Sequence, residues 1–414
     1  MMVRAPRASS ESGGSEPSPA KPNRVFVPDI CPRLPNPTGG GHAALQRSLA
    51  PGVWRPVLWD SGTRERSQPM RVLFVVNNPR KLRPSYTTTY LAAAASRRGH
   101  DVAFVSVDEL SHERQVTGRV VRAAAASSRD PASLASALQA SSAKSEDTSL
   151  AKFEVALLRN NPHLGDGASI RVNPAIELGR RLKQAGVMVL NDPDGLRRAG
   201  SKMYLAGFPA EIRPKTLITC SADRVRAFLR ELDGAAVIKP LFGYGGRNVF
   251  FVGRGENANL AQIISTVRSS GYLIAQEYVA AAARGDKRVL ALAGVPLEAD
   301  GQVAVYRRLH ASDDMRNNMH MGASRLRCRL TKAERKLCET IRPRLVADGL
   351  YLVGVDIAGD KILEINVFSP GGLHNMHELY NVDLSDAAIS DLERRFKLRD
   401  ASREPVPPHV FMRG

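Results

Sequence analysis

Short apolar runs alternate with amphipathic stretches along the chain from residue 70 onward. Apolar runs of about 4–8 residues bounded by turn-forming residues are typical of buried strands, and an apolar repeat of three to four residues is typical of helices. The runs predict strands at residues 71–77, 101–107, 153–158 and 187–190. The helical repeat predicts helices at 86–98 and 174–185, and an Ala/Ser-rich stretch at 119–150 predicts another helix with loose flanks. This succession is typical of an open α/β domain.

The pattern changes character after about residue 199. Strands are predicted at 237–240, 248–252 and 272–277, with a helix at 259–268. Near the C-terminus, two apolar runs at 355–357 and 363–367 predict strands joined by a tight turn at 358–360. Mixed strands and helices continue to about residue 395, and the Pro-containing tail that follows is predicted to be flexible.

Residues 1–69 are rich in Ser, Pro, Gly and Arg and have no steady periodicity, which predicts a disordered extension. The segment lacks the apolar core of a secretory signal. Its acidic residues and prolines disfavour a transit peptide, and a natural start at Met70 stays open. The two tryptophans of the chain, Trp54 and Trp59, leave local packing of this segment open as well.

Composition narrows the class of protein. The 414 residues leave room for two or three domains, and a hydrophobic fraction of 43% is ordinary for a globular protein. No apolar run reaches the roughly 20 residues needed to span a bilayer, so no membrane partner is expected. The four cysteines are scattered without a C-x-x-C pair, which disfavours a disulfide framework and a zinc site. We therefore expect a cytoplasmic protein.

The formal net charge of +18 suggests a nucleic-acid partner at first sight. The basic residues are dispersed, however, and aromatic residues are not interleaved with them. This distribution disfavours nucleic acid and is better explained by composition bias and small anionic substrates, which a positive field attracts.

Candidate metal ligands lie in the predicted C-terminal hairpin. Glu364 and Asn366 are two residues apart on one strand and therefore share a face, and the hairpin turn brings Asp356 beside them. Two carboxylates and an amide oxygen suit Mg²⁺ better than a metal that prefers sulfur or imidazole ligands.

Candidate phosphate ligands lie in the middle of the chain. The glycine-rich turn at residues 243–246 can present backbone N–H groups to phosphate oxygens, and Lys239 ends the strand before it. A glycine-rich hairpin turn alone is a weak signal, and a single lysine at a strand end, or a helical lysine such as Lys202, is usually only solvated. Neither the P-loop nor the Rossmann spacing is present.

Further polar residues follow in order. Residues 276–279 end a strand and suit a hinge whose backbone reads an adenine edge. Asp286 and Arg288 share one face of the next predicted strand, and Arg308, Arg316 and Asn318 follow.

Taken in order, these landmarks resemble bacterial glutathione synthetase, an ATP-grasp ligase, over residues 70 to about 395. The landmarks are residues 191–197, Ser201, Lys202, 238–240, 243–246, 285–288, Arg308, Arg316, Asn318, Asp356 and 364–370. The resemblance implies an α/β (α+β) ATP-grasp fold. The implied domains are an N-terminal open α/β (pre-ATP-grasp) domain at 70–198, a lid at 199–275 and a C-terminal mixed-sheet catalytic domain at 276–395, with an extension at 1–69 and a tail at 396–414.

The resemblance also implies roles for single residues. Those expected to bind ATP are Lys202, Lys239, Gly243, Gly245, Gly246, Glu277, Tyr278, Val279, Asp286 and Asn318. Those expected to act on the transferring phosphoryl group are Arg288, Arg316 and Lys239. Those expected to contact the substrate are Arg159, Asn161, Arg308 and Ser369. Asp356, Glu364 and Asn366 are expected to hold two Mg²⁺ ions, with Mn²⁺ as a possible substitute.

The implied reaction is ATP-dependent amide formation. A substrate carboxylate attacks the γ-phosphate of ATP, and an amine then displaces phosphate from the resulting acyl phosphate. The implied substrates are γ-glutamylcysteine and glycine, or another carboxylate and amino acid, and the implied assembly is a homodimer or homotetramer.

The chain departs from the family pattern in its N-terminal substrate elements. The family's Lys-Asp pair after the arginine is replaced here by Asn160 and Asn161, and His374 and His377 follow a Gly-Gly pair near the C-terminus. The two histidines line a substrate pocket or pack at a helix start. Two alternatives stay open: a ligase that adds an amino acid to a peptide or protein, and a non-catalytic nucleotide- or nucleic-acid-binding protein.

Overall fold

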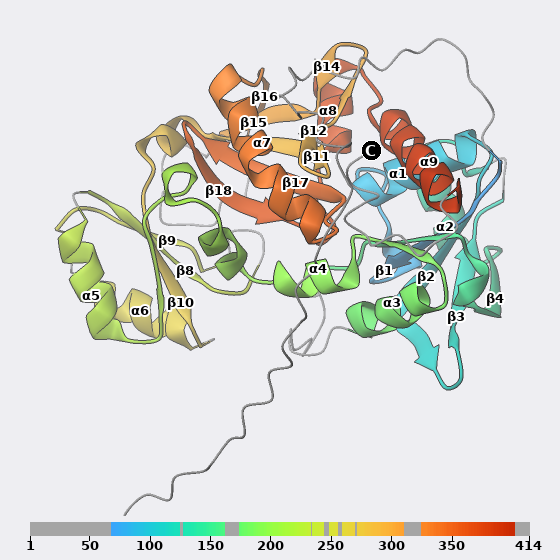
Figure 1. Ribbon diagram of the computed structural model, residues 1–414, viewed down its shortest axis with the longest axis horizontal. Coiled ribbons are helices and arrows are strands. Elements are labelled where there is room, and N and C mark those ends of the chain that lie inside the picture. Colours follow the sequence, from blue (N-terminus) through green and yellow to red (C-terminus); the bar gives the residue numbers. More distant parts are fainter. Residues whose placement is uncertain are drawn as a thin grey trace, which may run out of the picture. The chain divides into compact units, whose positions relative to one another are not determined.

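The computed structural model describes residues 68–124, 127–161, 174–232, 234–243, 248–255, 259–269, 271–309 and 324–401 (Figure 1). All of them fall within one compact unit, Leu58–Gly414. The predicted extension at 1–69 lies outside the described residues except for its last two.

The first sheet has six strands in the order β4-β3-β2-β1-β5-β6. Its parallel part comprises β1 (Arg71–Val76), β2 (Asp101–His112), β5 (Val155–Leu158) and β6 (Met188–Leu190). Parallel neighbours need crossover connections, here α1 (Thr87–Arg97) and α3 (Pro174–Gln184). The helices bury the sheet on both faces, which explains why β1 reads as an unbroken apolar run. These elements confirm the predicted open α/β arrangement.

The helix predicted within 119–150 is present as α2, but its flanks are strands and not loose coil. The segment contains the end of β3 (Val116–Arg122), then α2 (Pro131–Gln139) and the edge strand β4 (Lys144–Ser149). Asp130 caps α2 by accepting hydrogen bonds from the backbone N–H groups of Ala132 and Ser133, and Pro131 fixes the first helical turn. β4 is polar and mostly exposed, so only its ladder with β3 specifies it.

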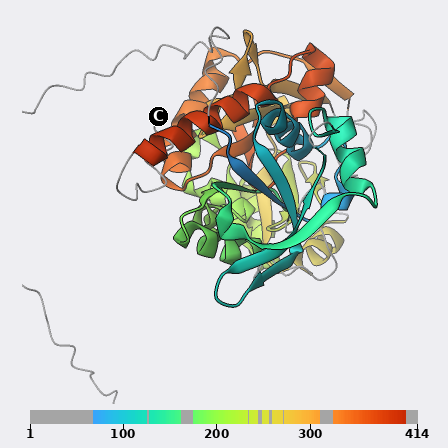
Figure 2. The same ribbon diagram turned by 90° about the vertical axis from the view of Figure 1, so that its right-hand side faces the viewer.

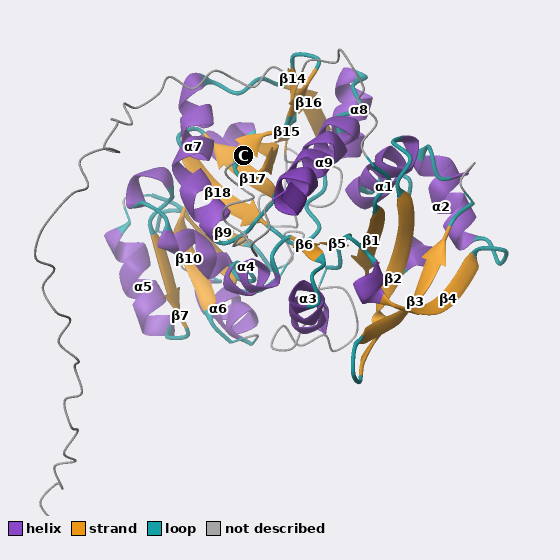
Figure 3. Cartoon of the chain, turned by 45° about the vertical axis from the view of Figure 1, so that its right-hand side comes forward, coloured by secondary structure: helices purple, strands orange, loops and turns teal. Residues whose placement is uncertain are grey.

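The second sheet is antiparallel, with the order β7-β10-β8-β9. Its strands are β7 (Thr216–Thr219), β8 (Ala236–Pro240), β9 (Phe250–Val252) and β10 (Leu273–Glu277). Helices α5 (Ala222–Glu231) and α6 (Leu260–Arg268) flank it (Figure 3). Side chains from both helices form a core with Ile238 and Leu273. Because side chains alternate along a strand, Lys239 and Gln276 project from the other face.

The third sheet has the order β16-β15-β11-β17-β18, again antiparallel. Its strands are β11 (Asp286–Leu292), β15 (Val305–Leu309), β16 (Ser324–Arg327), β17 (Leu352–Ala358) and β18 (Lys361–Asn366). β12 (Val295–Pro296) extends it beside β11, and β13 (Glu298–Ala299) pairs with β14 (Gln302–Val303). The predicted C-terminal hairpin is confirmed as β17 and β18.

Helix α7 (Lys332–Ala347) covers one face of this sheet. Thr331 and Glu334 form a capping box at its start, and Leu337, Ile341 and Leu345 pack on the sheet's apolar side chains. Glu334 also accepts a 2.7 Å hydrogen bond from Lys287 Nζ, so the Lys287 side chain lies on the face of the sheet that α7 covers. The neighbouring residues Asp286 and Arg288 therefore project from the opposite face.

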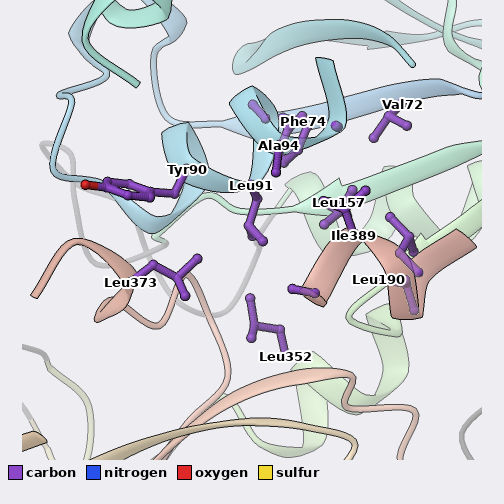
Figure 4. Close-up of a cluster of buried hydrophobic side chains, with 14 of the residues drawn as sticks. Val72, Phe74, Tyr90, Leu91, Ala94, Leu157, Leu190, Leu352, Leu373 and Ile389 are labelled. Atoms are coloured by element: carbon purple, nitrogen blue, oxygen red, sulfur yellow. The ribbon is translucent and has the colours of Figure 1, made fainter. Parts of the chain in front are cut away.

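Two helices connect the C-terminal region to the first sheet. α8 (Leu373–Tyr380) packs on β15 and β16, and α9 (Ser385–Ala401) packs on α1 (Figures 1 and 2). Tyr90 and Leu91 of α1 share a buried cluster with Leu373 and Ile389 (Figure 4). α9 runs past residue 396, where we expected the tail to begin, and Phe396 still packs against this cluster.

The remaining helices are short. They are α4 (Pro193–Arg198) and the 3-10 helices η1 (Pro79–Lys81), η3 (Leu150–Lys152), η4 (Lys202–Gly207), η5 (Ala210–Ile212) and η6 (Ala280–Arg284). Among the described residues, no helix is both long enough and apolar enough to cross a bilayer.

Candidate functional site

Asp356 lies at the centre of a charged cluster on the face of the third sheet opposite α7. It is directly opposite Arg288 in the β11–β17 ladder, and its side chain is almost fully buried. The Arg288 guanidinium donates to both carboxylate oxygens, at 2.9 Å for the Nη2–Oδ2 contact. Arg308 Nη2 lies 2.9 Å from the same Oδ2. The strand pairing thus brings two cations onto one buried carboxylate.

The two arginines decide the charge of Asp356. Burial alone would raise the pKa of its carboxyl, but the charges of Arg288 and Arg308 and their hydrogen bonds outweigh burial and lower the pKa to about 2. Asp356 is therefore ionised at every pH at which the protein is expected to work.

The predicted metal ligands converge as expected. Glu364 is directly opposite Asp356 in the β17–β18 ladder, and Asn366 Nδ2 lies 3.2 Å from Asp356 Oδ2. These oxygens suit a hard divalent cation. No group of three or more His, Cys, Asp and Glu side chains fit for a metal occurs in the described part of the chain, and this set has only two carboxylates. The site therefore fits an ion whose remaining ligands come from phosphate or water, as Mg²⁺ prefers.

Two lysines reach the same region from η4 and β8. Lys202, in η4, donates to the Gly243 carbonyl oxygen at 2.8 Å, and its Nζ lies 3.6 Å from Glu364 Oε1. Lys239 is the penultimate residue of β8 and donates to Gln276 Oε1 at 2.9 Å. Burial lowers the pKa of Lys239 to about 8, although the charge of Glu364 opposes the shift. Lysines, carboxylates and the described part of the glycine turn are thus in one network.

Gln276 was predicted only as part of the hinge backbone, and its side chain was given no role. It is buried, and it links Lys239 to Thr216 through its Nε2, which donates to Thr216 Oγ1 at 3.0 Å. A glutamine inside an otherwise apolar strand is the sequence signal that could have found it, because a buried amide side chain needs hydrogen-bond partners.

In the hinge at residues 277–279, one backbone N–H group has no hydrogen-bond partner among the described residues. Glu277 N–H donates to Lys215 O and Tyr278 N–H donates to Ala235 O, each at 2.9 Å. Val279 N–H has no partner among the described residues, while its carbonyl oxygen accepts from Ala282 N–H. The Glu277 side chain accepts from Lys215 N–H.

Asp286 is turned toward Arg308. Its two oxygens accept from Arg308 Nε at 3.2 and 3.1 Å, and the two residues are directly opposite each other in the β11–β15 ladder. Gly285 makes this approach possible, because its φ of +84° is in the left-handed region and a Cβ there would lie 2.1 Å from Arg308 O. Arg308, predicted as a substrate residue, therefore lies between Asp286 and Asp356.

Arg159 follows β5 and is buried, and no carboxylate of the described residues pairs with it. Its Nε donates to Thr88 Oγ1 at 3.2 Å and its Nη2 to Pro370 O at 3.0 Å. Burial lowers the pKa of this guanidinium to about 9. Asn161 N–H donates to Asn77 Oδ1 at 2.7 Å, and Asn77 Nδ2 donates to Asn161 O at 2.9 Å. These two hydrogen bonds join residues far apart in the sequence, so the sequence alone did not reveal them.

Ser369 is partly buried in the connection from β18 to α8, one residue before the carbonyl that receives Arg159. Gly245, Gly246, Arg316 and Asn318 lie outside the described residues.

Comparison with known proteins identifies the two halves of this architecture. Residues 70–197 match the family described as prokaryotic glutathione synthetase, N-terminal domain, and residues 201–381 match the ATP-grasp domain of the same family. The glutathione synthetase of Synechocystis sp. is 31% identical over 79% of this chain and 100% of its own length. The Gloeobacter violaceus glutathione synthetase is 32% identical over 77% of this chain and 95% of its own length.

Solved structures agree on the fold. D-cycloserine synthetase DcsG aligns with a TM-score of 0.54 at 16% identity, covering 78% of this chain and 99% of its own. The ATP-grasp ligase PsnB aligns with a TM-score of 0.50 at 20% identity, also covering 78% of this chain and 99% of its own. The predicted ATP-grasp fold, ligase class and family resemblance are confirmed. The chain belongs to the prokaryotic glutathione synthetase family and is an ATP-dependent carboxylate–amine ligase.

Proposed function

We propose that this ATP- and divalent-metal-dependent ligase joins the cysteinyl carboxylate of γ-glutamylcysteine to glycine, which makes glutathione. The observation that carries the proposal is the convergence of Lys202, Lys239, Arg288, Arg308 and Asp356 with the hairpin oxygens. That arrangement suits phosphoryl transfer, in which the protein mainly positions the reactants and neutralises charge. The names of the relatives supply the substrates.

The proposed sequence has two displacements. A carboxylate oxygen attacks the γ-phosphorus of ATP, the bond to the β–γ bridging oxygen breaks, and ADP leaves. The amine nitrogen then attacks the acyl carbon, and the C–O bond to phosphate breaks with its electron pair on phosphate. The ammonium of the amine substrate releases two protons, one to the departing phosphate and one to solvent.

The residues take the roles their contacts suit. Lys202 and Lys239 bind nucleotide phosphates, and the turn beginning at Gly243 covers them as a lid. Arg288 stabilises the transferring phosphoryl group, together with Arg316. Asp356, Glu364 and Asn366 would hold two Mg²⁺ ions, or Mn²⁺, whose charge offsets that of the phosphate oxygens when bound. Val279 N–H, which lacks a protein partner among the described residues, suits an adenine ring nitrogen.

Arg159 is proposed to bind a carboxylate of the dipeptide. Among the described residues this buried guanidinium donates to one hydroxyl and one carbonyl oxygen, which keeps donors available for an anion. Asn161 and Ser369 lie in the segments on either side of it and are proposed substrate contacts.

One observation favours a second candidate, in which the carboxylate belongs to a different molecule such as a peptide. The family's Lys-Asp pair is Asn160 and Asn161 here, which removes two charges next to Arg159. We further propose a cytoplasmic homo-oligomer, a dimer or tetramer; light scattering after size exclusion would measure its mass, and a monomer would contradict it.

The proposal is tested by ADP release with Mg-ATP, with and without γ-glutamylcysteine and glycine, and by mass spectrometry of the product. Release that needs both substrates and yields glutathione would support it. ATP binding without such dependence would overturn these substrates while leaving the ligase class intact.

A further inference from the structure

A pocket of about 280 Å³ is lined by Arg325 of β16 and by His374, Asn375, Glu378 and Leu379 of α8. None of these side chains has a role in the phosphoryl-transfer arrangement. Small-molecule sites usually measure about 300–1,000 Å³, so this pocket is at the lower limit and suits a ligand the size of an amino acid.

The strand ladder places Arg325 next to the reaction centre. Arg325 on β16 is directly opposite Arg308 on β15, so their side chains leave the sheet on the same face. Arg308 in turn contacts Asp356 at 2.9 Å. Adjacent strands are about 4.8 Å apart, which places the Arg325 backbone one strand from that of Arg308. Arg325 is exposed and has neither an ion pair nor a hydrogen bond among the described residues.

The opposite wall of the pocket belongs to α8, which is firmly held. Gly372 N–H donates to Thr87 Oγ1 at 3.1 Å at the start of the helix, and Tyr380 OH donates to Val305 O at 2.8 Å at its end. His374 and Glu378 are four residues apart and therefore share a helix face. A rigid helix of this kind can hold a small ligand in one orientation.

Acceptor groups gather on this wall. Asn375 Nδ2 donates to Tyr306 OH at 2.9 Å, which leaves its Oδ1 as an acceptor, and the Glu378 carboxylate lies one turn further along. His374 Nδ1 lies 3.2 Å from Tyr90 OH, so this contact fixes the ring and leaves Nε2 without a partner in the described part of the chain. The pocket thus has a cation on the sheet side and oxygen acceptors on the helix side.

We infer that this pocket binds the amine substrate as a zwitterionic α-amino acid, with Arg325 on its carboxylate and Glu378 and Asn375 Oδ1 on its ammonium. The inference rests on the proposed function, and it names the residues that select the amine. The apolar side chain of Leu379 limits the room beside the ligand. The site is one strand from Arg308, on the face where the acyl phosphate would form.

The test compares glycine with glycinamide, which keeps the amine and lacks the carboxylate. Replacing Arg325→Ala is expected to raise KM for glycine roughly ten- to hundredfold, the loss expected for one charged hydrogen bond, with KM for ATP and dipeptide unchanged. The wild type is expected to use glycinamide with a similarly raised KM, and Arg325→Ala is expected to change that value little. Arg325→Lys should recover part of the affinity for glycine.

Arg307→Ala is the matched control, because Arg307 is on the opposite face of β15 and lines no part of the pocket. It should leave KM for glycine unchanged. Glu378→Gln is the second variant, and it should raise KM for glycine and glycinamide alike because both carry the ammonium. An Arg325→Ala enzyme with unaltered KM for glycine, or with equal losses for both amines, would overturn the inference.

A failure of the proposed function has a different signature. In that case the wild type releases no ADP in response to γ-glutamylcysteine and glycine. Equilibrium dialysis with a mixture of radiolabelled amino acids and Mg-ADP then tests the pocket alone. Binding that Arg325→Ala abolishes and Arg307→Ala retains would support it, and a wild-type protein that binds none of them would overturn it.

Discussion

Asp356 stays charged in a buried position because two arginines lie beside it. Arg288 approaches from the adjacent strand β11 and Arg308 from β15, one strand further away, and their charges lower the pKa of the carboxyl to about 2 despite its burial. The cluster is thus preorganised: its charges are in place before any nucleotide arrives, which is the condition under which electrostatic stabilisation is most effective.

Removing the charge of Asp356 tests this arrangement. Asp356→Ala combined with Glu364→Ala is expected to abolish turnover, because the proposed metal ligands are lost. The single Asp356→Asn variant should lower kcat at least about a hundredfold, by analogy with the loss of one preorganised group. Steady-state ADP release at several Mg²⁺ concentrations measures both effects.

Asp360→Asn provides the control, because Asp360 is in the turn of the same hairpin with 78% of its side chain exposed. It should behave as wild type. Full activity in the double variant would show that the metal assignment is wrong.

Lys239 predicts a pH dependence. Its pKa of about 8 lies below the usual value for lysine, so most of its charge is present at pH 7 and is lost as the pH rises through about 8. If the ammonium binds ATP phosphates, kcat/KM for ATP should fall above pH 8, since this parameter reports the free enzyme. In Lys239→Arg the fall should move to higher pH. A profile that is flat from pH 7 to 9 in the wild type would contradict the role.

The metal candidates could be predicted from the sequence, and the setting of Arg159 could not. Glu364 and Asn366 are two residues apart on a strand, and the short turn before them brings Asp356 alongside, so local geometry was sufficient. Arg159 depends on Thr88 and on Pro370, which lies 211 residues away in sequence. No spacing rule reveals such a contact.

At the scale of elements, the end of α1 is joined to α9 through one glutamate, Glu393. Arg98 and His100, at and after the end of α1, both contact Glu393 on α9, at 2.6 Å for Arg98 Nη2 and 2.8 Å for His100 Nε2. His100 is fully buried, and its Nδ1 accepts from Met70 N–H at 3.2 Å. Glu393 therefore fixes α9 against the first sheet.

Replacing Glu393→Gln should destabilise the protein by about 3–5 kcal/mol, because Arg98 and His100 lose the charge of their buried partner. Urea unfolding followed by circular dichroism measures the free energy of unfolding. Glu339→Gln on α7 is the control: its ion pair with Lys336 is 62% exposed on the glutamate side, and such pairs contribute about 0–1 kcal/mol. Equal losses in the two variants would contradict the account of α9.

Elements with strong periodicity were predicted well, and those specified by tertiary contacts were not. β1 and α1 match their predicted ranges within about two residues, because a buried apolar run and an amphipathic repeat are local signals. The strands β3 and β4 were predicted as loose flanks of the helix between them, because Ala and Ser dominate the surrounding segment and β4 is polar. Only pairing with β3 makes β4 a strand.

For the whole molecule, the two family matches begin at residue 70 and end at residue 381. Every strand of the three main sheets lies in this range, and α9 adds the contact with α1. We therefore assign ligase activity to residues 70–401.

Deleting residues 1–69 should leave kcat and the KM values within about twofold of the full chain, because no described contact of the site involves them. Met70 then begins the chain, and its N–H contact with His100 can be kept. The same assay on both proteins, with circular dichroism as the folding control, decides the point. An inactive or insoluble product would show that the extension contributes to the fold.

At the Arg288–Arg308–Asp356 cluster we expect a substrate carboxylate to be activated as an acyl phosphate. The most direct measurement is oxygen transfer: γ-glutamylcysteine carrying oxygen-18 in its cysteinyl carboxylate is incubated with enzyme, Mg-ATP and glycine, and the released phosphate is weighed by mass spectrometry. We expect one oxygen-18 atom in each phosphate, because the attacking carboxylate oxygen leaves with it. Glutathione formed with unlabelled phosphate would contradict the acyl-phosphate route.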